Sequence, residues 1–268
     1  MNMSNNTHDF VFVVLVYRNT NDLVEFFANL SLPNTKVIVV NSYYDEESEK
    51  AFKEIAENNA ADFISVPNKG YGAGNNRGCE FALKNYKFRY LIISNADIEV
   101  KQMDLEQLIP YEDSIIAPKT LTLTGKNQNP FMIRHHPYID GVKNWAFKNN
   151  YRKVIKFFSM FSRIEREFYL KVTYPMFHNN QVYAAHGAFV IIPYSIINKL
   201  CPIYNEKMFL FAEEEHLAQM AKCQKIPIVY LPQIKVLHKE DGSTGAIGDN
   251  FKYIRESCIE FYNYWYNK

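Results

Sequence analysis

The stretch Phe10-Val-Phe-Val-Val-Leu-Val16 decides the fold class, because an unbroken run of β-branched, aromatic and aliphatic residues is typical of a strand buried on both faces. Residues 21–30 follow with the apolar spacing of a helix. The same order then recurs, with strands predicted at 36–40, 63–66 and 90–94 and helices at 45–58 and 71–86. This alternation predicts an α/β protein with a Rossmann-like, mostly parallel sheet and helices on both faces.

The alternation stops after residue 118, and residues 120–177 show no clear strand. Beyond them the sequence predicts a strand at 182–192, a helix at 213–224, short strands at 228–231 and 234–237, and an aromatic-rich helix at 250–266. We therefore expect a single domain in three parts, which are residues 1–118, a helical insertion over 119–181, and a second half with a C-terminal helix over 182–268.

Composition indicates which partners and which cellular compartment to expect. The 268 residues carry a net charge of +1, which argues against a dedicated nucleic-acid binder because phosphate neutralisation needs a basic excess. The four cysteines show neither CxxC pairing nor zinc-ligand spacing, which fits a reducing cytoplasm. The apolar run 10–17 is too short to cross a bilayer and lacks a basic lead-in, so we expect no signal peptide and no membrane span.

A glycine-rich segment, Asn68-Lys-Gly-Tyr-Gly-Ala-Gly-Asn-Asn-Arg-Gly78, lies between a predicted strand and a predicted helix. Glycines let a backbone approach a ligand and a helix N-terminus favours an anion, so a phosphate-bearing ligand is one interpretation. An ordinary glycine-rich turn is the other. The adjacent Asn75, Asn76 and Arg77 favour the ligand, because a turn alone does not need two amides and a guanidinium at a helix start.

Three further groups lie where parallel strands end or a helix begins. Asp97, in Asn95-Ala-Asp97, could bind a divalent cation that bridges a diphosphate, although an Asp after a strand is often only a turn former. Glu213-Glu-Glu215 opens a helix, where the macrodipole favours carboxylates whatever they do. His238 ends a predicted strand before a polar stretch, 239–244, suited to a closing loop. A role as ligand and a purely structural role are equally open for this histidine.

In combination, these motifs resemble the family 2 glycosyltransferases, especially their rhamnosyltransferase-like branch, whose pattern N-x-G-[FY]-x-x-G-N-N-x-G is nearly reproduced by residues 68–78. The resemblance covers about residues 1–118 and 183–244 and implies a GT-A type fold. Asp97 matches the metal-binding carboxylate of the D-x-D motif, with Asn95 in place of its first Asp, and His238 matches a histidine that can complete the metal site. Glu213 and Glu214 match the E-D pair, with Glu214 as catalytic base.

The resemblance also implies what binds the donor. His186-Gly-Ala-Phe-Val190 is similar to the x-G-A-F motif that lines the donor and acceptor cleft, and Asn41 follows the second strand near the nucleoside. The donor-binding residues expected from it are Tyr17, Asn41, Asn68, Gly70, Gly74, Asn75, Asn76, Asn95, His186 and Gly187. The implied reaction is an inverting, Mg²⁺- or Mn²⁺-dependent transfer from a dTDP- or UDP-linked sugar to a cell-surface polysaccharide or a lipid-linked glycan.

Two other functions are alternatives to glycosyl transfer. A nucleotidyltransferase would need a glycine-rich basic signature after the first strand, but Tyr17-Arg-Asn-Thr20 contains no glycine. A carbohydrate-binding relative without turnover stays open, because Asn95 and His216 stand where the family commonly has acids.

The insertion is basic and amphipathic. Its cations, Lys143, Lys148, Arg152, Lys153, Lys156, Arg163, Arg166 and Lys171, outnumber Glu165 and Glu167 and alternate with bulky apolar residues. Such a helix could lie on the inner, anionic surface of a membrane, aided by the aromatic cluster 261–266. The alternative is that it covers the acceptor side of the core or forms an oligomer interface, which the rule that an apolar stripe is more often buried than lipid-facing favours.

Overall fold

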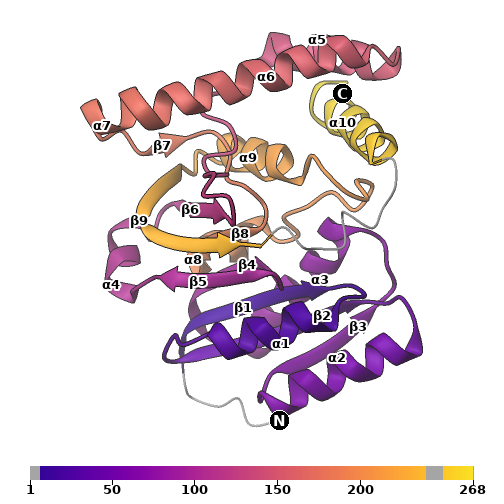
Figure 1. Ribbon diagram of the computed structural model, residues 1–268, viewed down its shortest axis with the longest axis vertical. Helices are drawn as coiled ribbons and strands as arrows, with labels where there is room; N and C mark the ends of the chain where they lie inside the picture. The colour runs from indigo at the N-terminus through magenta and orange to yellow at the C-terminus, as the bar shows by residue number, and fades with distance from the viewer. Residues whose placement is uncertain (1–6, 240–249, 268) are drawn as a thin grey trace.

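The structure, a computed structural model, describes residues 7–239 and 250–267. In this part of the chain one nine-stranded sheet runs in the order β3-β2-β1-β4-β8-β6-β9-β5, and β7 pairs with β9 (Figure 1). The strands are β1 (His8–Val16), β2 (Thr35–Ser42), β3 (Asp62–Val66), β4 (Phe88–Asn95), β5 (Ile98–Gln102), β6 (Ile115–Thr122), β7 (Gln181–Val182), β8 (Phe189–Pro193) and β9 (Ile228–His238). Only β5, β7 and β8 run antiparallel to their described neighbours, so the sheet is mostly parallel as predicted.

Helices cover both faces of the sheet, which confirms the predicted α/β class. Helices α1, α2 and α4 pack into one core cluster, and α3, α8 and α9 pack into the other. Their bounds are α1 (Thr20–Asn29), α2 (Glu46–Asn58), α3 (Tyr71–Asn85), α4 (Leu105–Leu108), α8 (Tyr194–Leu200) and α9 (Glu213–Cys223), and a 3₁₀ turn, η1 (Ile109–Tyr111), follows α4.

Strand β1 lies between these two layers. Phe12 and Val14 belong to the cluster under α1 and α2, whereas Val11 and Val13 belong to the cluster under α3. All four side chains are fully buried. The unbroken apolar run arises because alternate residues of a strand point to opposite faces and both faces are covered.

Several strands differ from the sequence-based prediction. Strands β5 and β6 were not predicted, and the strand predicted over 182–192 is two short strands joined by a loop. The two strands predicted at 228–231 and 234–237 form one strand, β9, because Pro232 sits in an irregularity where the partner of β6 jumps from Leu231 to Lys235. A proline is tolerated in a strand at such a point, since it removes no ladder hydrogen bond there.

The insertion after β6 is helical and forms the end of the molecule farthest from α2 (Figure 1). It contains α5 (Pro137–Lys148), α6 (Arg152–Phe168), a π-helical turn, η2 (Tyr169–Thr173), and α7 (Tyr174–Phe177). Helix α5 packs against both α6 and the terminal helix α10 (Phe251–Tyr266). No described helix is long and apolar enough to cross a membrane.

Candidate active site

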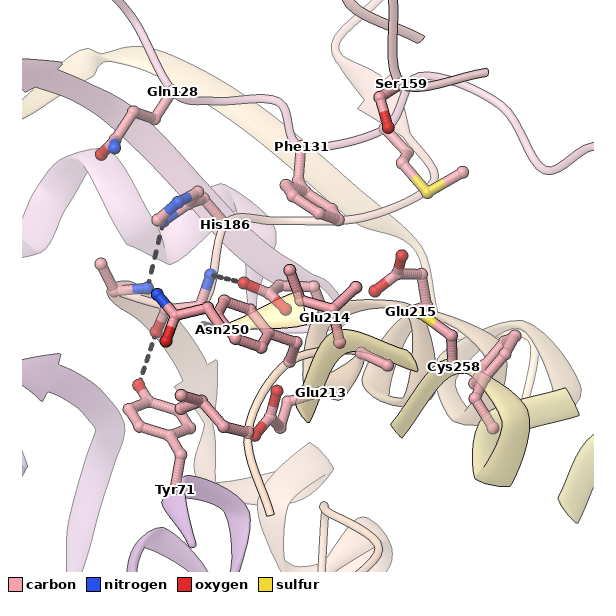
Figure 2. A pocket seen from close by; sticks show the side chains of 18 of the residues that line it. Tyr71, Gln128, Phe131, Ser159, His186, Glu213, Glu214, Glu215, Asn250 and Cys258 are labelled. Carbon is pink, nitrogen blue, oxygen red and sulfur yellow. Dashed lines mark hydrogen bonds between the residues drawn. The ribbon is translucent and has the colours of Figure 1, made fainter. Parts of the chain in front are cut away.

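A large cavity of about 1030 Å³ opens at the carboxyl ends of β1 and β4. In open α/β sheets this edge is where ligands bind. Helices α5, α6, α9 and α10 supply the remaining walls, and Figure 2 shows side chains from several of these elements facing one another. Of the site residues expected from the sequence, those that line the cavity are Tyr17, Asn95, Asp97, His186, Gly187, Glu213, Glu214 and His238.

Asp97 and His238 meet on one side of this cavity. Oδ2 of Asp97 lies 3.3 Å from Nε2 of His238, and both side chains are buried. Nδ1 of His238 lies 2.7 Å from Oε1 of Gln128. Because an amide oxygen can only accept, Nδ1 of His238 donates to Gln128, and Nε2 is the ring atom that faces the carboxylate of Asp97. An imidazole nitrogen and a carboxylate oxygen are both atoms that can hold a divalent cation.

His186 lies beside this pair but has a different role. Its ring centroid is 5.8 Å from that of His238, and its Nδ1 accepts a hydrogen bond from the backbone N–H of Ala188 at 3.2 Å (Figure 2). Burial, with the nearby charge of His238, lowers the pKa of His186 to about 3. The ring is therefore neutral near pH 7, and its backbone N–H is held by the side chain of Asn129 at 2.7 Å.

Glu213, Glu214 and Glu215 face the cavity from the first turn of α9 (Figure 2). The two residues before them, Phe211 and Ala212, have φ values of 73° and 66°. This left-handed backbone is costly for residues other than glycine. It turns the chain sharply into the helix and so aims three carboxylates at the cavity.

Glu214 has the best-defined surroundings of the three. Its Oε1 accepts a hydrogen bond from the backbone N–H of Gly187 at 3.2 Å, and a Cβ at Gly187 would come within 3.0 Å of that oxygen. Burial and the charge of Glu215 raise the pKa of Glu214 to about 7. Such a carboxyl group can take up a proton near neutral pH, as a general base must.

Glu213 is less accessible than Glu214. It is only 4% exposed, and its Oε1 has no hydrogen-bond partner among the described residues. Burial and the charge of Glu214 raise the pKa of Glu213 well above its usual value. His216, the next candidate along the helix, is also buried, and its Nδ1 accepts from Nε1 of Trp265 at 3.1 Å. His216 therefore fastens α10 to α9.

The composition of the glycine-rich segment, residues 68–78, favours a ligand beside its glycines, but in the structure protein atoms pack against them. An added Cβ would lie 2.1 Å from the backbone oxygen of Phe209 at Gly70, and 2.4 Å from a methyl group of Leu15 at Gly74. Protein atoms thus fill the space in which the glycines were expected to leave room for a ligand. The segment serves close packing of α3 against β1 and the 203–209 loop.

The asparagines of this segment also face protein. Asn76 is fully buried, and its Oδ1 accepts the backbone N–H groups of Ile203 and Tyr204, each at 3.1 Å. Asn75 donates to the carbonyl of Tyr71, and Asn68 accepts from the N–H of Gly70. None of the three lines the cavity described above. They position the residues that do.

Tyr71 connects α3 to the acidic side of the cavity, although the sequence did not single it out. Its hydroxyl donates to the carbonyl of Gly187 at 2.9 Å, opposite the N–H that Glu214 binds (Figure 2). Burial raises the pKa of Tyr71 well above its usual value, which keeps the donor protonated. Gly187 is therefore held at both its backbone N–H and its carbonyl.

The end of β1 and the end of β2 carry the remaining expected donor contacts. Tyr17 lines the cavity and packs edge-on against Tyr44, at 5.5 Å between ring centroids. The guanidinium of Arg18 lies 3.9 Å from the ring centroid of Tyr44. Asn41 is buried opposite Val16, donates to Ser65, and has no partner for its Oδ1 among the described residues.

Arg166 of α6 is a second residue that the sequence did not single out. It lines the cavity, its Nη1 donates to the backbone oxygen of Gln128 at 3.3 Å, and its buried Nε has no partner in the described chain. Its charge contributes to the low pKa of His186, so it lies near the Asp97–His238 pair. Burial lowers the pKa of Arg166, which indicates a poorly solvated cation.

No group of three or more His, Cys, Asp or Glu side chains that could hold a metal occurs within residues 7–239 and 250–267. Asp97 and His238 would supply at most two ligand atoms to an ion, and further ligands would have to come from a donor or water. The loop expected to close over the site, 239–244, lies outside the described residues except for Lys239.

The open sheet and the acid-lined cavity at its carboxyl edge define an α/β transferase of the GT-A type. The chain belongs to glycosyl transferase family 2, whose model matches residues 12–173. It is 21% identical over 238 residues to the low-salt glycan biosynthesis hexosyltransferase Agl10 of Haloferax volcanii, covering 87% of this chain and 67% of that protein.

Two solved structures share the fold. GalNAc-T7, solved with UDP, GalNAc and Mn²⁺, gives a TM-score of 0.56 at 12% identity, over 88% of this chain and 44% of that one. The 1-349 portion of S. aureus TarS, in complex with UDP-GlcNAc, gives 0.53 at 14% identity, over 91% and 60%. This chain thus spans less than two thirds of either structure.

Proposed function

We propose that this protein is an inverting glycosyltransferase that moves a sugar from a nucleoside-diphosphate sugar to an acceptor hydroxyl. The observation that carries this proposal is the division of the cavity into two acidic centres. Asp97 pairs with His238 at one, and Glu214 is held by Gly187 at the other. One centre suits a cation and a diphosphate, and the other suits the removal of a proton.

The residues around Asp97 fit a Mg²⁺ or Mn²⁺ ion. Asp97 and His238 would hold the ion, because their facing carboxylate oxygen and imidazole nitrogen lie 3.3 Å apart and both atom types are ligands of such ions. When bound, the ion would neutralise charge on the leaving diphosphate. Gln128 orients the His238 ring through the hydrogen bond at Nδ1. Arg166 adds a fixed positive charge on the same side.

Glu214 acts as the base in this proposal. The N–H of Gly187 fixes one oxygen of Glu214, and Tyr71 in turn binds the carbonyl of Gly187. The carboxylate takes the proton of the attacking hydroxyl while the donor's bond to the diphosphate breaks. A single displacement of this kind inverts the anomeric centre, and no covalent sugar–protein intermediate is needed.

The substrates follow from the family and its relatives. The donor is a UDP- or dTDP-linked hexose, and the structure in which TarS holds UDP-GlcNAc supports a nucleotide-sugar donor. The acceptor is a cell-surface polysaccharide or a lipid-linked glycan, supported by the glycan-biosynthesis hexosyltransferase among the relatives. Such acceptors are met at the cytoplasmic face of a membrane, where we place the protein.

A titration and a product assay together test this function. UDP-glucose, UDP-galactose, UDP-GlcNAc and dTDP-rhamnose are titrated with and without Mn²⁺, and the bound donors are then assayed for release of nucleoside diphosphate with a simple glycoside acceptor. We expect Mn²⁺-dependent binding of at least one donor and a product of inverted configuration by NMR. A retained configuration would overturn the single displacement, and binding without turnover across all acceptors would indicate a sugar-nucleotide-binding protein.

A further inference from the structure

Helix α6 has two faces with different surroundings, one toward the cavity and one toward solvent. Ile155, Ser159, Ser162 and Arg166 line the cavity. With 3.6 residues per turn, Phe157, Met160, Ile164 and Phe168 fall on the opposite side of the helix. We call these four residues the α6 outer face. The cavity and the α6 outer face are therefore separated by one helix diameter, about 10 Å.

The side chains of the α6 outer face are exposed to solvent. Phe157 is 58% exposed and Ile164 is 59% exposed, and α6 contains no buried residue along its 17 positions. The exposed apolar surface continues at the end of α7, where Phe177 is 70% exposed. A soluble surface seldom carries such a row of large apolar side chains without a partner.

The charged residues on and around α6 are mostly positive. The exposed cations of this stretch are Arg152, Lys153, Lys156, Arg163 and Lys171, of which Arg163 also lines the cavity and Arg152 lies over the ring of Phe251. The two acids of α6 are only half-exposed and are paired, since Glu165 contacts His136 at 3.3 Å and Glu167 contacts Lys171 at 3.2 Å. The partner of this surface should therefore be both apolar and anionic.

We infer that the α6 outer face docks on an anionic lipid surface, with α6 lying in the plane of the bilayer interface. Basic amphipathic helices bind in this way, with the apolar side chains among the acyl chains and the cations at the headgroups. The 17 residues of α6 span about 25 Å along the surface. This inference needs only the surface of α6 and does not depend on the proposed reaction.

A second copy of the chain is the main competing occupant. In a two-fold dimer the same patch meets itself, so the cations of one copy would lie near those of the other. The α6 outer face offers no exposed acid of its own to neutralise them. Charge complementarity therefore favours lipid over a second copy.

Vesicle co-sedimentation tests the inference without donor or acceptor present. The full chain is mixed with phosphatidylcholine vesicles that contain phosphatidylglycerol, or with phosphatidylcholine alone, at low and high salt. We expect binding to the anionic vesicles at low salt and release at high salt, because salt screens the cations. Lack of binding to anionic vesicles at low salt would overturn the inference.

Three variants assign the binding to this face. The triple change Phe157→Ser, Met160→Ser and Ile164→Ser should lower partitioning at least tenfold. Lys153→Gln with Lys156→Gln should lower it by roughly 25-fold, about fivefold for each cation near an anionic surface. Val24→Ser is the control, since Val24 is similarly exposed on α1 at the opposite end of the molecule and should bind like wild type.

The same variants exclude the alternatives. Equal vesicle binding by the triple variant and wild type would place the contact elsewhere and overturn the inference. A wild-type dimer in analytical ultracentrifugation that the triple variant loses, with no vesicle binding, would assign the face to a second copy instead. Transfer to a short, water-soluble acceptor should stay unchanged in all three variants, so failure here is distinct from failure of the proposed reaction.

Discussion

Asp97 and His238 are brought together by the antiparallel pairing of β5 with β9, in which Ile98 lies opposite His238. Asp97 precedes Ile98 at the tight turn after β4, so its carboxylate reaches Nε2 of His238 at 3.3 Å. The contact joins the two halves of the chain; the sheet register sets which residues meet, and Gln128 orients the His238 ring. A change in that register would separate the two side chains even if both residues were kept.

Asp97→Ala should abolish metal-supported transfer, lowering kcat/KM by about 10³-fold or more, because the ion would lose its carboxylate ligand. Mn²⁺-dependent binding of UDP, measured by titration calorimetry, should disappear as well. Asp113→Ala, at an exposed carboxylate away from the cavity, should behave like wild type. Full activity of Asp97→Ala, or of wild type in excess chelator, would show that the metal assignment is wrong.

Glu214→Gln should still bind donor but lose transfer by roughly 10²–10⁴-fold, which is the usual contribution of a positioned general base. The loss should fall on kcat, since the amide keeps the size of the side chain. Glu213→Gln provides the comparison, because Glu213 is more deeply buried in the same turn. If Glu213→Gln is inactive and Glu214→Gln is active, the base is the earlier residue.

The raised pKa of Glu214, about 7, predicts a pH dependence of both rate and stability. A base works when deprotonated, so kcat/KM should rise with pH through about 7. Stability should change the opposite way: the protonated carboxyl suits its buried site, so its contribution is complete below about 4.5 and is lost as pH rises through about 7.

Thermal unfolding at several pH values checks the stability part. Glu214→Gln cannot ionise, so it should become more stable than wild type above pH 7, by up to about 3 kcal/mol for a shift of this size. A constant difference in melting temperature between pH 5 and pH 8 would contradict the assigned shift.

Arg166→Gln should weaken transfer by roughly 10–100-fold, because a poorly solvated positive charge would be lost from the side of the cavity that receives the diphosphate. The affinity for UDP should fall in the same variant, which a purely structural role would not require. Arg134→Gln, at an exposed arginine outside the cavity, is the matched control. Unchanged UDP affinity in Arg166→Gln would remove this residue from the donor site.

Gly70→Ala should destabilise the protein much more than Gly125→Ala. Both glycines have positive φ, 104° and 78°, but only Gly70 has protein atoms where a Cβ would lie. Gly125→Ala should lose about 1 kcal/mol for the backbone, and Gly70→Ala should lose roughly 2–3 kcal/mol more, because φ 104° with ψ 173° is almost restricted to glycine and because the Cβ would clash with Phe209. Melting temperatures measure the difference, and equal values would show that the 203–209 loop yields to the added methyl group.

The parallel half of the fold could be predicted because its signals are local. Residues 10–16 are apolar without interruption, and the helices that cover both faces follow at once along the chain. Strands β5 and β6 could not be predicted in the same way. The first is a half-exposed edge strand with alternating charges, and the second contains Pro118. Pairing with distant strands stabilises both, with β9 as a neighbour of each and β8 as the other neighbour of β6.

Part of the candidate site could be predicted from the sequence for the same reason. Asp97, Glu214 and His238 stand at element ends, where a strand or helix pattern locates them, and the structure lines one cavity with all three. Tyr71 and Arg166 reach the cavity through packing between distant elements, which no spacing along the chain encodes. Asn75 and Asn76 have a ligand-like composition. Buried hydrogen bonds to the protein account for Asn76, whereas Asn75 donates to Tyr71 and its Oδ1 has no partner among the described residues.

Helix α10 is tied to the cavity wall by side chains of its last turn, which limits how parts of this chain can be exchanged with those of relatives. Trp265 donates to His216 on α9, and Tyr266 donates to Asp140 on α5 at 3.2 Å. A chimaera that imports this wall of the cavity from a relative must therefore take α5, α9 and α10 as one block. Exchanging any one of them alone would remove one of these hydrogen bonds between side chains of the wall.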